Sequence, residues 1–213
     1  MTNRLPVFSD RRKICIICEG NEEYAYLDQL KTLHVWNEQY EISLDNAGGN
    51  GNIPARYQDR YQNGSYELVL IFCDTEKKPH EQYADIKRKV NEFHGVDHAA
   101  EAVMIFGNPC TMQIIIKHWA DINLKSPAKP VNAPLMKEYT GVDNYKGRAD
   151  QIKTIMTYIT AENYADMRRR VDGLETVDTV AGSSNFGNFM KFFESEDSGW
   201  IEEINAELED CDD

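Results

Sequence analysis

Three acidic residues follow two short apolar runs in this sequence. Glu19 comes directly after the run 13–18, and Asp74 and Glu76 come within three residues of the run 67–73. If both runs are neighbouring buried strands, their ends meet at one edge of a sheet, where open α/β folds bind ligands. Converging carboxylates are hard oxygen donors that suit Mg²⁺ or Mn²⁺, and such ions assist phosphodiester cleavage. We therefore expect Glu19, Asp74 and Glu76 to be metal ligands and catalytic residues; the alternative is that each is an ordinary loop acid.

Residues near these acids offer groups that can bind a phosphate. Gly48 and Gly49 belong to a glycine-rich loop, 47–52, whose backbone N–H groups can approach a phosphate. The loop lacks the Gly-Lys-Ser/Thr ending of a nucleotide-binding P-loop, and a plain turn is the alternative. Lys77 follows the acidic turn, and Lys146 lies among several other bases. We expect both lysines to contact substrate, with Lys146 or Arg148 neutralising charge on a phosphate.

A third motif, Asn108-Pro109-Cys110, follows a later apolar run at 102–106. Asn-Pro starts turns, and Pro109 suits the first turn of a helix that Asn108 would cap. A functional interpretation, compatible with the cap, places the Asn108 amide beside the acids, where it holds an acid or a phosphate. His118 lies nearly three helical turns further on, about 15 Å away, so we expect it to be a packed or capping histidine.

These residues are positioned by a regular alternation of predicted strands and helices. Apolar runs of strand length occur at 13–18, 40–44, 67–73 and 102–106. Helical patterns occur at 21–34, 54–62 and 80–93, and from residue 109 to about 119. Continuous apolar strands that alternate with helices predict an α/β fold with a mostly parallel central sheet and helices on both faces.

The C-terminal part of the chain is predicted to be mainly helical. Segment 123–144 holds three prolines, so we expect a long loop or a small insertion there. Helical patterns follow at about 145–160, 163–172, 184–194 and 199–209. We expect an α/β core over residues 1–122 and a loop and helical extension over 123–213 that packs on it, with an acidic tail from about residue 194.

The formal net charge of −13 comes mainly from this C-terminal tail. Residues 194–213 carry ten acids and no Lys or Arg, whereas the remaining residues carry 26 acids and 23 bases. A nearly balanced body does not exclude binding to nucleic acid. The tail is either a solubilising terminus or a segment that competes with nucleic acid or docks on a basic partner.

The composition predicts a cytoplasmic protein that does not enter a membrane. Hydrophobic residues make up 41% of the chain, and no apolar run approaches the roughly 20 residues that span a bilayer. The N-terminus lacks the apolar region of a signal peptide. Five cysteines, three of them in strand-like runs, suggest buried reduced thiols. Because Cys15 and Cys18 would point to opposite faces of a strand, a zinc or disulfide pair is excluded.

Four motifs, taken in order, resemble the TOPRIM pattern of primases, topoisomerases and OLD-type nucleases. They resemble more closely the RloB-like branch of TOPRIM-like proteins, which is associated with bacterial phage-defence loci. The matching segments are Cys18-Glu19-Gly20, Gly48-Gly49-Asn50-Gly51, Asp74-Thr75-Glu76, and Asn108-Pro109-Cys110 with His118-Trp119. The resemblance implies a TOPRIM-like fold and a Mg²⁺- or Mn²⁺-dependent nuclease that cleaves RNA or DNA. Glu19, Asp74 and Glu76 would then bind the metal, or Glu19 would act as general acid or base.

Two departures from the family pattern bear on this expectation. Glu76 stands where the family has a second Asp, and Met112 stands where the family tends to place an acid. The resemblance also implies a defence-system partner such as an ATPase, and it leaves room for an oligomer. The alternative function is a non-catalytic or degenerate TOPRIM-like module that binds and regulates such a partner.

Overall fold

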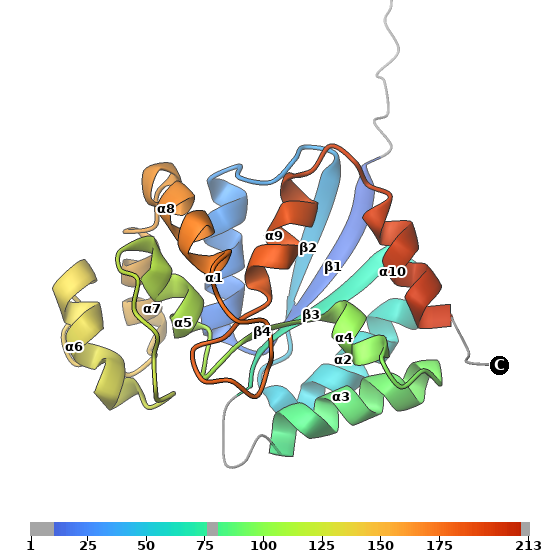
Figure 1. Cartoon of the computed structure of the whole chain (residues 1–213), viewed down its shortest axis with the longest axis horizontal. Helices are drawn as coiled ribbons and strands as arrows, with labels where there is room; N and C mark the ends of the chain where they lie inside the picture. Colours follow the sequence, from blue (N-terminus) through green and yellow to red (C-terminus); the bar gives the residue numbers. More distant parts are fainter. Residues whose placement is uncertain (1–10, 76–80, 210–213) are drawn as a thin grey trace, which may run out of the picture.

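The computed structural model describes residues 11–75 and 81–209, and within them one sheet of four parallel strands forms the centre of the molecule (Figure 1). The strand order is β2-β1-β3-β4, and all three neighbouring pairs are parallel. The strands are β1 (Arg12–Cys18), β2 (Tyr40–Asn46), β3 (Leu68–Asp74) and β4 (Met104–Gly107). The predicted α/β class with a parallel central sheet is confirmed.

The two central strands are apolar because each has a strand on either side and a helix layer on both faces. All seven residues of β3 are buried, and so are the last five of β1. The register aligns the strand ends, since Cys18 pairs with both Asn46 and Phe72. The residues that follow β1 and β3 therefore emerge side by side at the carboxyl edge of the sheet.

Helices cover both faces of this sheet (Figure 1). On one face α1 and α9 meet, where the ring of Phe186 packs against Tyr26 and Phe72 with centroids 5.7 and 5.6 Å away. On the other face α2 contacts β1 and β3, α4 contacts β3, and α3 contacts both α2 and α4. The helices are α1 (Asn21–Thr32), α2 (Ile53–Gln62), α3 (Glu81–His94), α4 (Ala99–Val103), α5 (Met112–Ile115), α6 (Lys129–Thr140), α7 (Ala149–Met156), α8 (Ala161–Val171), α9 (Phe186–Glu194) and α10 (Trp200–Glu209). Two short 3₁₀ helices are η1 (Asn50–Asn52) and η2 (Ile116–His118).

The segment 123–144, predicted to be a long loop or a small insertion, contains a helix, α6, at Lys129–Thr140. Pro130 lies in the first turn, where a backbone N–H has no partner within the helix and its loss costs little. Pro134 lies inside the helix. A buried face formed by Asn132, Met136 and Thr140, at intervals of four residues, shows that packing outweighs the proline penalty.

The prediction for the Asn108-Pro109 motif is also wrong in one respect. The Asn108–Pro109 peptide bond is cis, and α5 begins only at Met112, with Thr111 at its N-cap position. Asn108 therefore does not cap the helix. The helix itself is a single turn of α5 that continues as η2 and ends at His118.

The outer edge of β4 is closed by side chains from the segment before α9. The Asn185 amide accepts from Phe106 N at 2.9 Å and donates to Met104 O at 2.8 Å. Ser184 Oγ donates to Phe106 O at 2.6 Å. These bonds take the place of a fifth strand and leave no open edge at β4.

The C-terminal helices predicted at 184–194 and 199–209 correspond to α9 and α10. They pack through aromatic side chains: Trp200 stacks on Phe192 with centroids 5.0 Å apart and lies edge-on to Phe193. The last residues of the acidic tail, 210–213, lie outside the described part of the chain. Among the residues that are described, no helix has the length and apolar character needed to cross a membrane.

Candidate functional site

The structure brings Glu19 and Asp74 together at the carboxyl edge of the sheet. Glu19 N donates to Phe72 O at 2.9 Å, which continues the pairing of β1 with β3 by one residue. The backbone N–H of Asp74 in turn donates to Glu19 Oε2 at 2.9 Å. The third predicted ligand, Glu76, and the predicted substrate contact Lys77 lie outside the described residues.

Asp74 is buried, with 8% of its surface exposed, and its carboxylate is held in place by Thr111. Asp74 Oδ1 accepts from the backbone N of Thr111 at 2.6 Å and from its hydroxyl at 2.8 Å. Burial raises the pKa of the Asp74 carboxyl well above its usual range, and the carboxylates of Glu23 and Glu19 raise it further. The position of Asp74 thus costs folding free energy, which is typical of groups placed for binding rather than for stability.

Two more acids come from the first turn of α1. Glu23 is 4% exposed, and its Oε2 accepts from Gly20 N at 3.0 Å in a capping interaction. Burial, followed by the charge of Glu22, raises the pKa of Glu23. Glu19, Glu22, Glu23 and Asp74 therefore form a cluster of four carboxylates, which we call the acid cluster.

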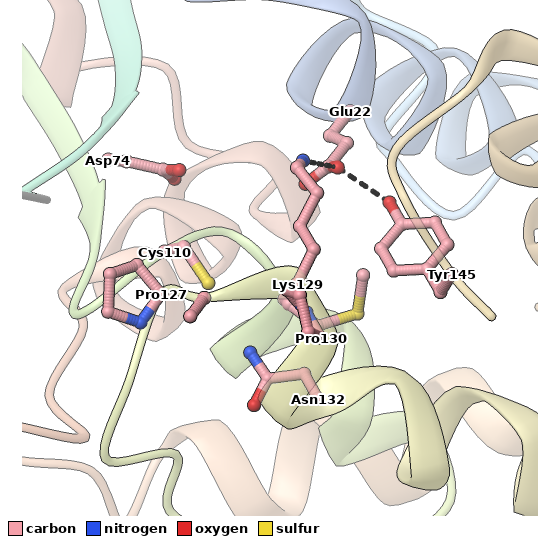
Figure 2. Close-up of a pocket in the computed structure, with 10 residues that line it drawn as sticks. Glu22, Asp74, Cys110, Pro127, Lys129, Pro130, Asn132 and Tyr145 are labelled. Atoms are coloured by element: carbon pink, nitrogen blue, oxygen red, sulfur yellow. Dashed lines mark hydrogen bonds and ion pairs between the residues drawn. The ribbon is translucent and has the colours of Figure 1, made fainter.

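A pocket of about 370 Å³ opens beside the acid cluster (Figure 2). Glu22 lies on its wall and accepts a hydrogen bond from the Tyr145 hydroxyl at 2.6 Å and from the Lys129 ammonium. Lys129 Nζ also lies 5.7 Å from the centre of the Tyr145 ring. Asp74 faces the pocket from the opposite side. The pocket thus combines acids from β3 and α1 with a cation from α6.

The glycine-rich loop supports Glu19 through its backbone. Gly49 N donates to Glu19 O at 2.8 Å, and Gly48 N donates to the Asn46 side chain at 2.8 Å. Gly49 has a φ of 128° and a ψ of 156°, a conformation that is essentially restricted to glycine. In the amide orientation that points the Asn50 nitrogen at Glu19, this nitrogen donates to Glu19 Oε2 and Oε1 at 2.7 and 2.9 Å. The backbone N–H groups of Gly48 and Gly49, which were predicted to bind a phosphate, therefore both donate hydrogen bonds within the protein.

Two other predicted substrate contacts, Asn108 and Lys146, do not line the pocket. The Asn108 side chain is buried, and its amide donates to Asp178 O at 2.6 Å rather than to an acid of the cluster. Lys146 is exposed and is not among the residues that line the pocket. Among the residues that the structure describes, the cation that lines the pocket beside the acids is Lys129.

His118 and the cysteines have the structural roles that the sequence predicts. His118 is 1% exposed and is hydrogen-bonded to the Tyr26 hydroxyl at 3.0 Å and to Asn163 Oδ1 at 2.8 Å. Burial lowers the pKa of His118 to about 4. Within the described residues the four cysteines, at 15, 18, 73 and 110, are free and buried.

Sequence reasoning missed Glu22, Glu23 and Thr111, and it placed Lys129 and Tyr145 only within a broad basic stretch, 117–153, without linking them to the acids. Glu23 had a usable signal, because a glutamate three residues after an N-cap often folds back on the helix start. Thr111, Lys129 and Tyr145 reach the site only through tertiary packing, and no local pattern identifies them.

The acid cluster does not by itself form a complete metal cage. Over residues 11–75 and 81–209, no three His, Cys, Asp or Glu side chains are grouped closely enough to hold an ion. The chain matches no protein-family model, no curated protein and no solved structure in the comparisons made. The site is therefore interpreted from its own geometry and chemistry.

Proposed function

We propose that this chain is a divalent-metal-dependent nuclease, with Glu19 and Asp74 as its metal-binding and catalytic acids. The observation that carries the proposal is the acid cluster itself. Asp74 and Glu23 are buried while Glu19 and Glu22 are half-buried, burial and mutual repulsion raise the pKa of Asp74 and Glu23, and a pocket opens beside them. A bound cation would offset the repulsion between these carboxylates, and this would explain why the fold places them close together.

The donor set suits Mg²⁺ or Mn²⁺. Both ions prefer carboxylate oxygens and keep several waters, so two protein carboxylates are a sufficient anchor when the substrate phosphate supplies further oxygens. Glu19 and Asp74 come from adjacent strand ends and are linked by the hydrogen bond from Asp74 N. Glu76 as a third ligand stays a prediction.

Each residue around the pocket has a distinct part in the proposed reaction. A divalent cation held by the acids supplies Lewis-acid stabilisation of the phosphate charge. Thr111 fixes the orientation of the Asp74 carboxylate through its two hydrogen bonds. Lys129 adds positive charge at the pocket wall, where a phosphate would lie. Alternatively, Glu19 acts as general acid or base instead of binding the metal.

The resemblance to TOPRIM-like and RloB-like proteins supports RNA or DNA as the substrate class. It also supports a role in bacterial phage defence, with an ATPase or another defence protein as partner. The parallel sheet with acids at its carboxyl edge is the arrangement that this resemblance implies.

The test is cleavage of end-labelled RNA and DNA strands by the purified chain with Mg²⁺ or Mn²⁺. Glu19→Gln and Asp74→Asn are expected to abolish cleavage. Glu41→Gln, an equal charge change at an exposed position of β2, is expected to leave it intact. Cleavage that persists in both site variants would refute the proposed roles.

One observation favours the second candidate, a non-catalytic module that regulates a partner protein. Met112, which stands where the family tends to place an acid, is 2% exposed and forms part of the pocket wall. Its thioether gives the pocket no charge at that point. The two candidates differ in metal binding, because only the nuclease requires Mn²⁺ to bind at Glu19 and Asp74.

A further inference from the structure

The pocket beside the acid cluster is larger and more apolar than a metal site requires. Within the described part of the chain, its charged side chains are Glu22, Asp74 and Lys129. The rest of the wall is mainly apolar and consists of Cys110, Met112, Pro127, Ala128, Pro130 and the ring of Tyr145. Small-molecule sites have this composition, with a largely apolar wall and a few polar groups that fix orientation.

The apolar wall is rigid. Met112 and Tyr145 are each 2% exposed, and Cys110 is 6% exposed, so these side chains are fixed by the surrounding core. Pro127 and Pro130 restrict the backbone that carries the opposite wall. A ligand therefore meets a preformed surface and does not have to order it, which favours binding of a flat apolar group.

One buried polar side chain adds specificity to this wall. Asn132 lines the pocket and is 4% exposed. Its amide nitrogen donates to Ser126 O at 3.0 Å. A primary amide has a second N–H and an oxygen acceptor, which match the polar edge of a nucleobase.

We propose that this pocket binds a single nucleotide, with its base against the apolar wall and its phosphate between Asp74 and Lys129. The proposal rests on the proposed function, because a phosphate beside four carboxylates requires the divalent cation. The volume of about 370 Å³ lies at the lower end of the range for ligand pockets and accommodates one nucleotide rather than a duplex. The nucleotide is either a free nucleoside monophosphate or the end of a single strand.

The first test is calorimetry of the full chain with Mn²⁺, comparing adenosine and uridine 5′-monophosphates with ribose 5-phosphate. Stacking of a base on protein side chains is worth about 5- to 150-fold in affinity. At least one nucleotide is therefore expected to bind more tightly than the sugar phosphate by a factor in that range. If neither does, the apolar wall does not bind a base and the inference is overturned.

The second test fills the pocket from its rim. Ala128 is exposed and lines the pocket, so Ala128→Trp is expected to weaken nucleotide binding about 5- to 150-fold by steric exclusion. Val131→Trp is the matched control, because Val131 is 60% exposed on the same helix and does not line the pocket. Equal nucleotide affinity in the two variants would contradict the inference.

Mn²⁺ binding measured without nucleotide distinguishes a failure of the nucleotide inference from a failure of the proposed nuclease function. If the wild-type chain and Ala128→Trp both bind Mn²⁺ but the base adds no affinity, the inference fails and the proposed function stands. If the wild-type chain binds no Mn²⁺, the proposed function fails. A three-residue adenylate strand in the same titration supports a strand end if it binds more tightly than the monophosphate, and a free nucleotide if it does not.

Discussion

Protonation of His118 is predicted to lower the stability of the folded chain, including the segment that orients Asp74. His118 ends the short helical stretch that begins just after Thr111, and it is 1% exposed. Its ring nitrogens are both engaged, by Tyr26 and by Asn163 on α8. A charged imidazole in this position has no carboxylate partner among the hydrogen bonds of its ring, so the folded protein disfavours the charged form.

The size of the stability loss follows from the difference between the pKa of His118 in the folded chain and its pKa in the unfolded chain. Burial lowers the pKa of His118 to about 4, from about 6.5 in an unfolded chain. Between these values the unfolded state binds more protons, so the free energy of unfolding falls as the pH falls. The loss attributable to His118 is about 2 kcal/mol between about pH 7.5 and pH 5, and about 3 kcal/mol below pH 4.

The assay is urea unfolding of the wild type and of His118→Gln across this pH range. Gln keeps a polar side chain but does not titrate, so the pH-dependent difference between the two proteins isolates His118. Glu23 and Asp74, whose raised pKa values act in the opposite direction, are present in both proteins and cancel. If the two proteins lose stability in parallel between about pH 7.5 and pH 5, the reasoning about His118 is refuted.

Three further predictions concern the site itself. Thr111→Val removes the hydroxyl that donates to Asp74, so it is expected to lower the free energy of unfolding by about 1–3 kcal/mol and to weaken Mn²⁺ binding about 10- to 100-fold. Thr111→Ser keeps the hydroxyl and is expected to retain both the stability and the Mn²⁺ affinity. Urea titration and calorimetry check this, and equal behaviour of the two variants would contradict it. Asp74→Asn relieves the repulsion from Glu23 and Glu19, so the metal-free variant is expected to be about 0.5–2 kcal/mol more stable than the wild type at neutral pH. Because the pKa of Asp74 is raised, this gain in stability should shrink as the pH falls and the wild-type carboxyl takes up its proton. Thermal unfolding of both proteins at several pH values checks this prediction. An Asp74→Asn variant that is less stable than the wild type at neutral pH would contradict it. Gly49→Ala is expected to lower the free energy of unfolding by about 1–3 kcal/mol because of the backbone conformation at this position. Gly51→Ala, with open space around it and no positive φ, should lower it less. Similar losses for the two variants in chemical unfolding would argue against strain at position 49.

The sheet and the first two acids could be predicted because their signals are local. Each buried strand appears as a continuous apolar run, and the acid after it marks the strand end. The parallel order then places Glu19 beside Asp74 without further information. The start of β4 was harder to place, because residues 99–103, which include part of the apolar run, form α4.

The remainder of the site could not be predicted because it depends on contacts between distant segments. Lys129 and Tyr145 reach Glu22 across more than a hundred residues of sequence. The prolines around Lys129 indicated a loop, yet the packing of α6 makes that segment helical. Asn108 was predicted to face the acids, but its amide donates to Asp178 O, a contact that no local pattern in the sequence indicates.

The Asn108 motif nevertheless has a consequence for the site. The chain leaves β4 at Gly107, passes through the cis bond and presents Thr111 to Asp74. A Cβ at Gly107 would lie 2.9 Å from Cys110 O, so glycine is needed for this close turn. The motif therefore positions an acid indirectly, through the residue that follows it.

Binding of Mn²⁺ to the full chain is the most direct measurement of the central claim. Calorimetry of the wild type is expected to show saturable binding that is lost or strongly weakened in Glu19→Gln and Asp74→Asn and retained in Glu41→Gln. Absence of Mn²⁺ binding by the wild type, or equal binding by all four proteins, would contradict the assignment of Glu19 and Asp74 as a metal site.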